Sequence, residues 1–179
     1  MSMDIKIASS EQFEIIHSIM EQAARRIKDK GSTQWAHVLH GAEADSLKNH
    51  LHKHEVYIGI VSDEIVAFCY LTLTASQWDE TLWEDVTVES TANVYYLHKL
   101  ALKQGWTGQG IADKFLIGLQ QKISENYSKK VAIRLDCMAE KSMLTQLYER
   151  NNFEFVARKE DVQATGFIAP FNIYTWYSS

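Results

Sequence analysis

A strand that runs into closely spaced glycines and then into a helix constrains the fold of this chain more than any other stretch. Aromatic and branched residues alternate with others over residues 95–102, which predicts a strand. Three glycines then interrupt regular structure: Gly105, Gly108 and Gly110. After them, apolar residues recur at three- to four-residue spacing: Ile111, Ala112, Phe115, Leu119 and Ile123. This spacing predicts a helix with one buried stripe.

The junction between these glycines and the predicted helix has the properties of an anion site. The first amide groups of a helix have no partner inside the helix and point outward. The positive end of the helix dipole lies at the same place, and glycines let a large anion approach the backbone closely. We therefore predict a phosphate or pyrophosphate site over residues 108–112. The alternative is a turn that only caps the helix.

Three known kinds of glycine loop bind phosphates, and two of them do not match. The phosphate loop of nucleotide hydrolases ends in Gly-Lys-Ser/Thr, whereas Ile111 and Ala112 follow Gly110 here. The dinucleotide fingerprint needs further glycines in register near the start of the chain. The run from Thr107 to Ala112 resembles instead the pyrophosphate loop of the GCN5-related N-acetyltransferases (GNATs), Gln/Arg-x-x-Gly-x-Gly/Ala. Thr107 stands in the place of the Gln or Arg.

Length, charge and composition exclude several classes of protein. With 179 residues, 46% of them hydrophobic, the chain is expected to form a single domain over residues 1–179. The formal net charge of −5 argues against a nucleic-acid partner. No apolar run is long enough to span a bilayer and no signal peptide is evident, so we expect a cytoplasmic protein without a membrane partner. The two cysteines, Cys69 and Cys137, are expected to be reduced core residues, and no Cys/His spacing predicts a metal site.

The remaining elements predict a mixed α/β fold. A capping box formed by Ser9 and Gln12 opens the first helix, and Gly31 ends it. Helices are expected over residues 13–30, 44–54, 111–123 and 141–150, and strands over 4–8, 56–61, 65–74, 95–102, 130–138, 153–159 and 171–177. This order predicts a mixed antiparallel and parallel sheet with helices on both faces, and it differs from an all-parallel doubly wound sheet.

Residues 77–86 carry four acids and two tryptophans with no clean period. They suit either a solvated surface loop with its aromatic rings tucked down or a loop that covers a cationic substrate. Trp35, just after the first helix, is either a core residue or a wall of a substrate pocket.

A second motif agrees with the glycine loop. The run from Leu147 to Phe153 resembles the GNAT helix-to-strand signature Leu-Tyr-x-x-x-Gly-Phe. Asn152 stands in the place of the glycine, and asparagine is the next best residue for a left-handed helix end. The resemblance covers essentially the whole chain. A bacterial, small-molecule branch of the family also has a Gln-Trp pair after its first helix and an acidic loop with tryptophan, as at Trp35 and residues 79–83.

The resemblance implies a cofactor site. Acetyl-coenzyme A would lie in a V-shaped cleft where the strands over residues 95–102 and 130–138 splay apart. The first strand would pair with the pantetheine arm and hold the acetyl carbonyl, and the glycine loop would bind the pyrophosphate. The implied cofactor-binding residues are Leu100, Ala101, Leu102, Thr107, Gly108, Gln109, Gly110, Ile111, Ala112, Asp113 and Lys141. Lys141 stands where the family often has an asparagine.

Acetyl transfer to an amine needs groups that move protons. The attacking amine must be neutral, so a base or a water chain must take its proton. His98 is the candidate base, because imidazole exchanges protons near neutral pH, and alternation along the strand would put it on one face with Tyr96 and Leu100. A structural histidine is the alternative, with Tyr96 or an acid of residues 79–85 as the base. Tyr148 matches the tyrosine that commonly protonates the departing thiolate, unless it is a packing residue.

The predicted function is transfer of an acetyl group from acetyl-coenzyme A to a primary amine of a small molecule. The candidate substrate-binding residues are Trp35, Trp83, Tyr96 and Asp136. Two alternatives stay open, namely a catalytically silent coenzyme A sensor and a protein or peptide N-acetyltransferase. The aromatic last strand would suit a homodimer in which it extends a sheet across two copies.

Overall fold

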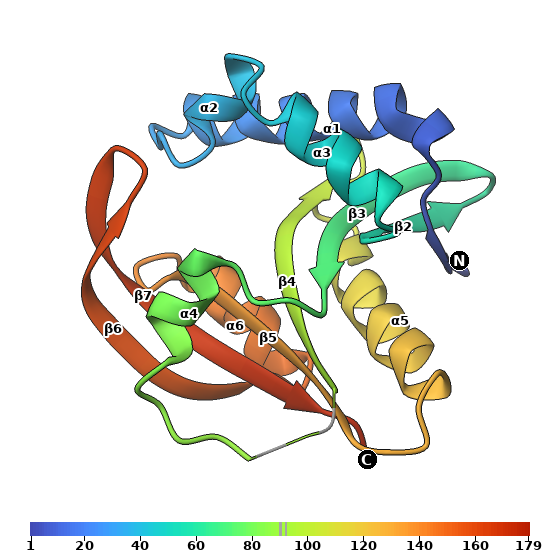
Figure 1. Cartoon of the computed structure of the whole chain (residues 1–179). Helices are drawn as coiled ribbons and strands as arrows, with labels where there is room; N and C mark the ends of the chain where they lie inside the picture. The colour runs from blue at the N-terminus through green and yellow to red at the C-terminus, as the bar shows by residue number, and fades with distance from the viewer. Residues whose placement is uncertain (90, 92) are drawn as a thin grey trace. The chain divides into compact units, whose positions relative to one another are not determined.

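The computed structural model describes residues 1–89, 91 and 93–179, which form two compact units (Figure 1). Unit 1 consists of Met1–Leu71 and His98–Gly118, and unit 2 of Thr72–Leu97 and Leu119–Ser179. The elements are β1 (Asp4–Ile7), η1 (Ser10–Gln12), α1 (Phe13–Asp29), α2 (Ala36–Leu39), α3 (Ala44–His52), β2 (Val56–Val61), β3 (Glu64–Thr72), α4 (Gln77–Trp83), β4 (Asn93–Leu102), α5 (Ile111–Glu125), β5 (Val131–Met138), α6 (Ser142–Arg150), β6 (Glu154–Ala164) and β7 (Phe167–Tyr177). Strand β4 and helix α5 each run through both units, so the single domain expected over residues 1–179 stays a prediction.

The predicted mixed sheet is confirmed. In the described part of the chain, strands are hydrogen-bonded in the order β1-β2-β3-β4-β5-β7-β6. The pairs β1–β2, β2–β3, β5–β7 and β6–β7 are antiparallel, whereas β4 and β5 are parallel. The parallel register joins Asn93–Tyr96 to residues 131–134 and ends at the pair Tyr96↔Arg134.

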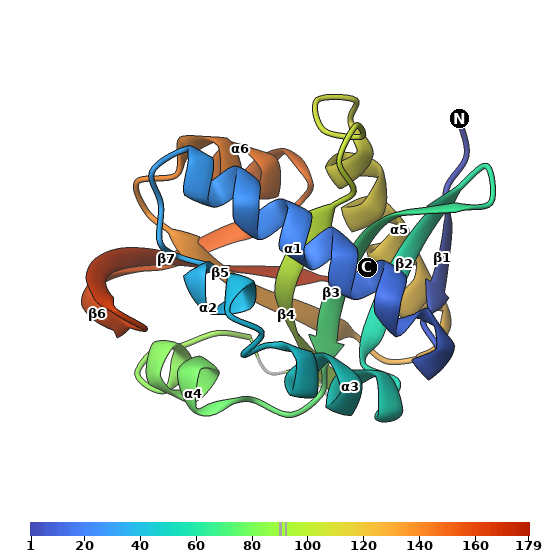
Figure 2. The ribbon, with the colours of Figure 1, turned by 90° about the horizontal axis from the view of Figure 1, so that it is seen from above.

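Unit 1 carries helices on both faces of its strands, as Figure 2 shows. The apolar stripe of α1 packs with α3 on one face, where Ile16 and Leu47 are buried with Ile58 and Phe68. Helix α5 covers the other face, and a Cβ at Gly59 would lie 2.9 Å from the Phe115 ring. Glycine is therefore required at this point of β2 for the helix to approach the strand.

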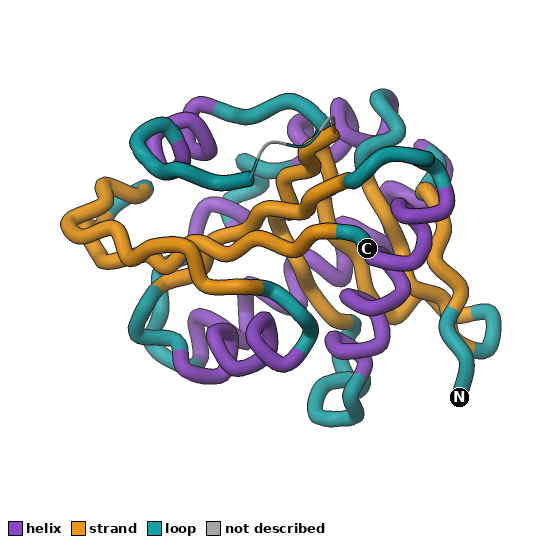
Figure 3. Tube along the Cα trace, turned by 90° about the horizontal axis from the view of Figure 1, so that it is seen from below, coloured by secondary structure: helices purple, strands orange, loops and turns teal. Residues whose placement is uncertain are grey.

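Unit 2 places α4 on one face of its strands and α6 on the other, and Figure 3 shows a helix on each side of the β6–β7 ribbon. Alternation along β7 explains this division. Phe171 and Ile173 pack in a cluster with Trp83 of α4, whereas the ring of Tyr174 lies 6.0 Å from the ring of Tyr148 on α6.

Two expectations about unit 2 were wrong. Residues 77–83 form a helix instead of a loop, because Ser76 and Asp79 form a capping box in which each backbone amide donates to the side chain of the other residue, at 2.9 and 3.2 Å. The β6–β7 hairpin is also longer than the strands expected over residues 153–159 and 171–177. A bulge with Asp161 at φ 52° and a proline at position 170 interrupt the strand pattern there. None of the described helices is long and apolar enough to cross a membrane.

Candidate functional site

The glycine turn, residues 104–110, connects β4 to α5 in unit 1. All three of its glycines adopt left-handed backbone conformations, with φ of 89°, 76° and 73° at Gly105, Gly108 and Gly110. A Cβ added to any of them would meet no atom within 4 Å. The backbone conformation therefore favours glycine at these three positions. The space beside their Cα atoms is open. The predicted turn-to-helix junction is confirmed, because α5 begins at Ile111.

Hydrogen bonds within residues 105–114 stabilise the turn and the start of α5. The Gln109 side chain donates from Nε2 to the carbonyl of Gly105 at 2.6 Å, and the amide of Lys114 donates to the carbonyl of Gly110 at 3.1 Å. Residues 107–110 are exposed, whereas Ile111 is buried. The turn thus presents its backbone to solvent at the positive end of a fifteen-residue helix.

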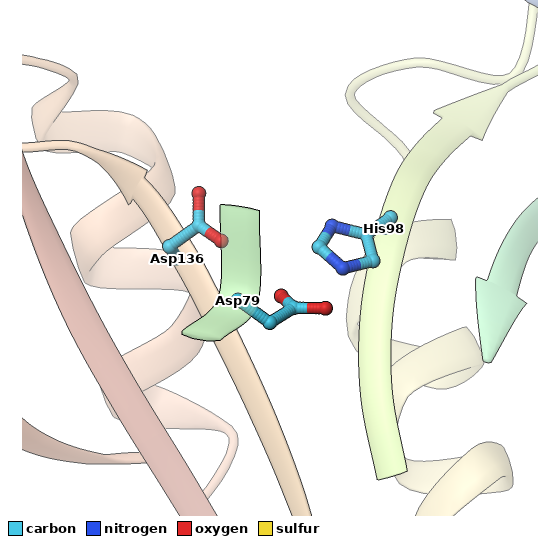
Figure 4. Close-up of side chains that lie close together, drawn as sticks. All are labelled: Asp79, His98 and Asp136. Atoms are coloured by element: carbon cyan, nitrogen blue, oxygen red, sulfur yellow. The ribbon is translucent and has the colours of Figure 1, made fainter. Parts of the chain in front are cut away.

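Strand β4 does not alternate regularly at the residues predicted to hold the donor. Lys99 has a left-handed φ of 57°, so the alternation that would put His98 and Leu100 on one face is interrupted between them. The carbonyl of Leu102 accepts a hydrogen bond from Arg26 Nη2 at 2.7 Å. His98 lies on β4 as predicted (Figure 4).

Helix α6 in unit 2 carries Tyr148 and starts just after Lys141. Lys141 is the N-cap residue, and its side chain makes no capping hydrogen bond. Tyr148 is 5% exposed, and its ring packs edge-on against the ring of Phe153 at 5.8 Å. Asn152 adopts a φ of 69°, which confirms that asparagine takes the left-handed position at the end of this helix.

The face of unit 2 that α4 covers is lined by aromatic and charged side chains, and we call it the α4 face: Trp78, Asp79, Trp83, Tyr96, Arg134, Asp136 and Thr175. The guanidinium carbon of Arg134 lies 4.7 Å from the Trp83 ring centroid and 5.8 Å from that of Tyr96. Arg134 also donates from Nη1 to the Tyr96 hydroxyl at 3.1 Å. These contacts bring two predicted substrate residues together around a cation.

Asp136, a third predicted substrate residue, lies on the same face. Its Oδ2 accepts a hydrogen bond from Trp78 Nε1 at 3.1 Å. Carboxylate oxygens of Asp79 and Asp136 lie within 4.8 Å of one another. Figure 4 shows the two side chains, which come from α4 and β5. Asp79 is 2% exposed and accepts from both the amide and the hydroxyl of Ser76, each at 2.9 Å. Two carboxylates and an indole therefore meet where α4 begins.

The fourth predicted substrate residue, Trp35, belongs to unit 1. It lies next to α2, packs against the core of that unit, and has Lys99 Nζ 5.3 Å from its ring centroid. The two cysteines are free and buried, as expected. Burial raises the pKa of the Cys69 thiol well above its usual range and, with a contribution from Asp136, raises the pKa of Cys137 to about 12. Neither is therefore suited to act as a thiolate.

Sequence reasoning missed Trp78 and Arg134 as residues of this face. A signal for Arg134 existed, because Arg134 and Asp136 are polar alternates in an otherwise apolar strand. Trp78 and Asp79 lie within residues 77–86, where a loop was expected; the spacing of Ser76 and Asp79, which is typical of a capping box, was the signal that could have found the helix.

Comparison with known proteins assigns the chain to a family. YesJ of Bacillus subtilis strain 168, described as an uncharacterized N-acetyltransferase, is 32% identical over 146 residues, which cover 82% of this chain and 78% of YesJ. A GNAT-family acetyltransferase from Listeria monocytogenes 4b F2365 has a TM-score of 0.74 and 26% identity, covering 98% of this chain and 94% of that one. The chain therefore belongs to the GCN5-related N-acetyltransferase family and is an acetyltransferase.

A more distant structure shares the fold. RimL, an alpha-N-protein acetyltransferase of ribosomal L7/L12 in complex with coenzyme A, matches with a TM-score of 0.69 and 13% identity over 99% of this chain and 94% of that one. At this identity the likeness shows the fold alone. No protein-family model matches the chain.

Proposed function

We propose that this enzyme transfers an acetyl group from acetyl-coenzyme A to a primary amine of a small molecule by direct attack. The observation that carries the proposal is the glycine turn, with three left-handed glycines open to solvent directly before α5. Such a turn fits a pyrophosphate, because amide donors and the helix dipole favour a compact anion and no side chain blocks it. RimL, with the same fold, carries coenzyme A in its structure.

The proposed donor site uses mainly backbone groups of unit 1. Residues 107–113 would bind the pyrophosphate, and the backbone of Leu100, Ala101 and Leu102 would pair with the pantetheine arm. Because Thr107 replaces the basic or amide side chain of the family motif, binding depends more strongly on amides. Lys141, in unit 2, stays a predicted cofactor-binding residue.

Acetyl-coenzyme A supplies a thioester whose carbonyl carbon the amine attacks as the carbon–sulfur bond breaks. His98 would take the proton that the amine loses, since a protonated amine has no lone pair with which to attack. The hydroxyl of Tyr148 would give a proton to the departing thiolate. A strand amide of β4 would stabilise the negative charge that develops on the carbonyl oxygen.

For the amine, we propose the α4 face of unit 2, with Asp136 as the charged contact and the rings of Trp83 and Tyr96 beside it. Aromatic faces and a carboxylate both attract an ammonium group. The indole bond from Trp78 fixes one oxygen of Asp136 at 3.1 Å, which orients the carboxylate before an amine binds. Trp35, in unit 1, stays a predicted substrate-binding residue.

The test is thiol release from acetyl-coenzyme A with a panel of polyamines, aminoglycosides, amino acids and peptides. We expect release with at least one small amine. Tight coenzyme A binding without release for any amine would favour the silent sensor, and release with peptides alone would favour a protein or peptide acetyltransferase. A cytoplasmic location, the absence of a nucleic-acid partner and a homodimer stay predictions. The expectation that the last strand extends a sheet across two copies was wrong, because β7 is hydrogen-bonded between β5 and β6.

A further inference from the structure

Aromatic side chains orient Arg134, and no described carboxylate pairs with it. The rings of Trp83 and Tyr96 and the Tyr96 hydroxyl contact its guanidinium, at 4.7, 5.8 and 3.1 Å. Within the part of the chain that the structure describes, no carboxylate forms an ion pair with it. A partly buried guanidinium that its neighbours orient, but do not neutralise, is prepared to bind an anion with planar geometry.

A second observation points to the same place. The Arg134 Nε and the Thr175 Oγ1 are buried, and neither has a hydrogen-bond partner among the described residues. Thr175 is 2% exposed and lies directly opposite Arg134 in the β5–β7 register. Directly opposed residues have their side chains on the same face of a sheet. Two residues that lie opposite each other on the α4 face therefore each have a buried polar atom without a hydrogen-bond partner among the described residues, although such atoms normally have one.

The charges along β5 alternate over a short distance. Asp136 follows Arg134 by two residues, so both side chains project from the same face, about 6–7 Å apart at the backbone. The carboxylate of Asp79 adds negative charge beside Asp136. A positive and a negative site at this spacing match a small molecule that carries both a carboxylate and an amine.

We propose that the acceptor is an amine that also carries a carboxylate, and that Arg134 selects it by binding that carboxylate. The inference rests on the proposed acetyl transfer and narrows its substrate class to amino-acid-like amines. Asp136 would attract the amine while Arg134 fixes the other end of the molecule. A polyamine would instead bring positive charge against Arg134 and be disfavoured.

The experiment compares L-amino acids with their carboxamides, which keep the amine and side chain but lose the negative charge. We expect wild-type protein to have a kcat/KM at least tenfold higher for the carboxylate of the best pair. Arg134→Gln should lower this ratio at least tenfold, and Arg134→Lys should keep part of it. Comparing ratios between variants cancels the different basicities of the two amines.

Arg158→Gln is the matched control, because it removes the same charge from an exposed residue of β6 that pairs with Glu160 at 2.6 Å. This variant should leave the ratio of kcat/KM for the amino acid to kcat/KM for its carboxamide unchanged. A wild type that acetylates carboxamides equally well, or an Arg134→Gln protein with an unchanged ratio, overturns the inference while leaving acetyl transfer standing.

A thermal-shift titration in the presence of coenzyme A separates this inference from the proposed function. Wild-type protein should be stabilised by the amino acid and not by its carboxamide, and Arg134→Gln should lose the difference. This result without thiol release for any amine would defeat acetyl transfer but support the carboxylate site. If Arg134→Gln does not fold, absence of carboxylate-dependent stabilisation in the wild type is sufficient to overturn the inference.

Discussion

The glycine turn of unit 1 and the α4 face of unit 2 are built by different means. The turn presents backbone groups that come from one short stretch, while side chains of Gln22 and Glu64 accept hydrogen bonds from Gln104 and Trp106. The α4 face is made of side chains from α4, β4, β5 and β7, so residues such as Trp78 and Asp136 meet across 58 positions of sequence. A backbone site accepts a group common to many reactions, whereas a side-chain site can differ with each substrate.

This difference separates the site that members of the family would share from the site that would be specific to one substrate. The turn agrees with membership of an acetyltransferase family whose enzymes have in common the group that they transfer. The charges of the α4 face carry our inference about the acceptor. The two regions should therefore respond differently to substitution, and the following predictions test that contrast.

The largest effect is expected for Gly110→Trp in the glycine turn. An indole at a left-handed position that faces open space would block the approach of the pyrophosphate. Loss of two hydrogen bonds from backbone amides to the charged pyrophosphate, at about 1.5–3 kcal/mol each, corresponds to roughly 1,000-fold weaker coenzyme A binding. Isothermal titration calorimetry measures the change.

Gly166→Trp is the matched control. Gly166 also has a left-handed φ, 83°, and open space around its Cα, but it lies in the β6–β7 turn of unit 2. The free energy of unfolding should fall by a similar amount in both variants, and only Gly110→Trp should bind coenzyme A more weakly. Equal affinities would show that the glycine turn does not hold the donor.

The same contrast explains which parts of the molecule the sequence could predict. The glycine turn and α5 were predictable because spacing and backbone chemistry within one stretch determine them. Helix α4 was not, since its seven residues show no clear apolar period, and its stability comes from a cap at Ser76 and from aromatic rings buried against distant strands. The left-handed backbone at Lys99 was not predictable either, because a positive φ is uncommon for any residue other than glycine and lysine gives no local signal of it.

Tyr148→Phe should lower kcat by about 100-fold, the usual scale of general acid catalysis, with little change in coenzyme A affinity. Phenylalanine keeps the ring that packs against Phe153 at 5.8 Å, so the fold should persist. Tyr174→Phe is the control on the same side of unit 2. Burial and the neighbouring Glu149 raise the pKa of Tyr174 to about 12, and its hydroxyl donates to Glu149 at 3.1 Å. An equal loss of kcat in both variants would assign Tyr148 a packing role.

Ser76→Ala should lower the free energy of unfolding by about 1 kcal/mol, the usual loss for an N-cap serine. The hydroxyl both accepts from the Asp79 amide at 3.2 Å and donates to its carboxylate at 2.9 Å. Ser9→Ala should cost less, because Ser9 caps a three-residue 3₁₀ helix at the exposed start of unit 1, whereas the Ser76 hydroxyl also donates to the carboxylate of Asp79. Urea unfolding compares the two. A larger loss from Ser9→Ala would mean that the cap does not hold α4.

The smallest difference is expected between the two cysteines, one in each unit. Cys69 is 0% and Cys137 4% exposed, and burial raises the pKa of both thiols, so neither should react with a thiol reagent in the native protein at about pH 8. Because β4 and α5 run through both units, local unfolding of one unit should disrupt the other. Pulse labelling at increasing urea, resolved by mass spectrometry of the two cysteine peptides, should therefore give one midpoint. Labelling of either cysteine at clearly lower urea would show that the units unfold separately and that residues 1–179 are not one cooperative domain.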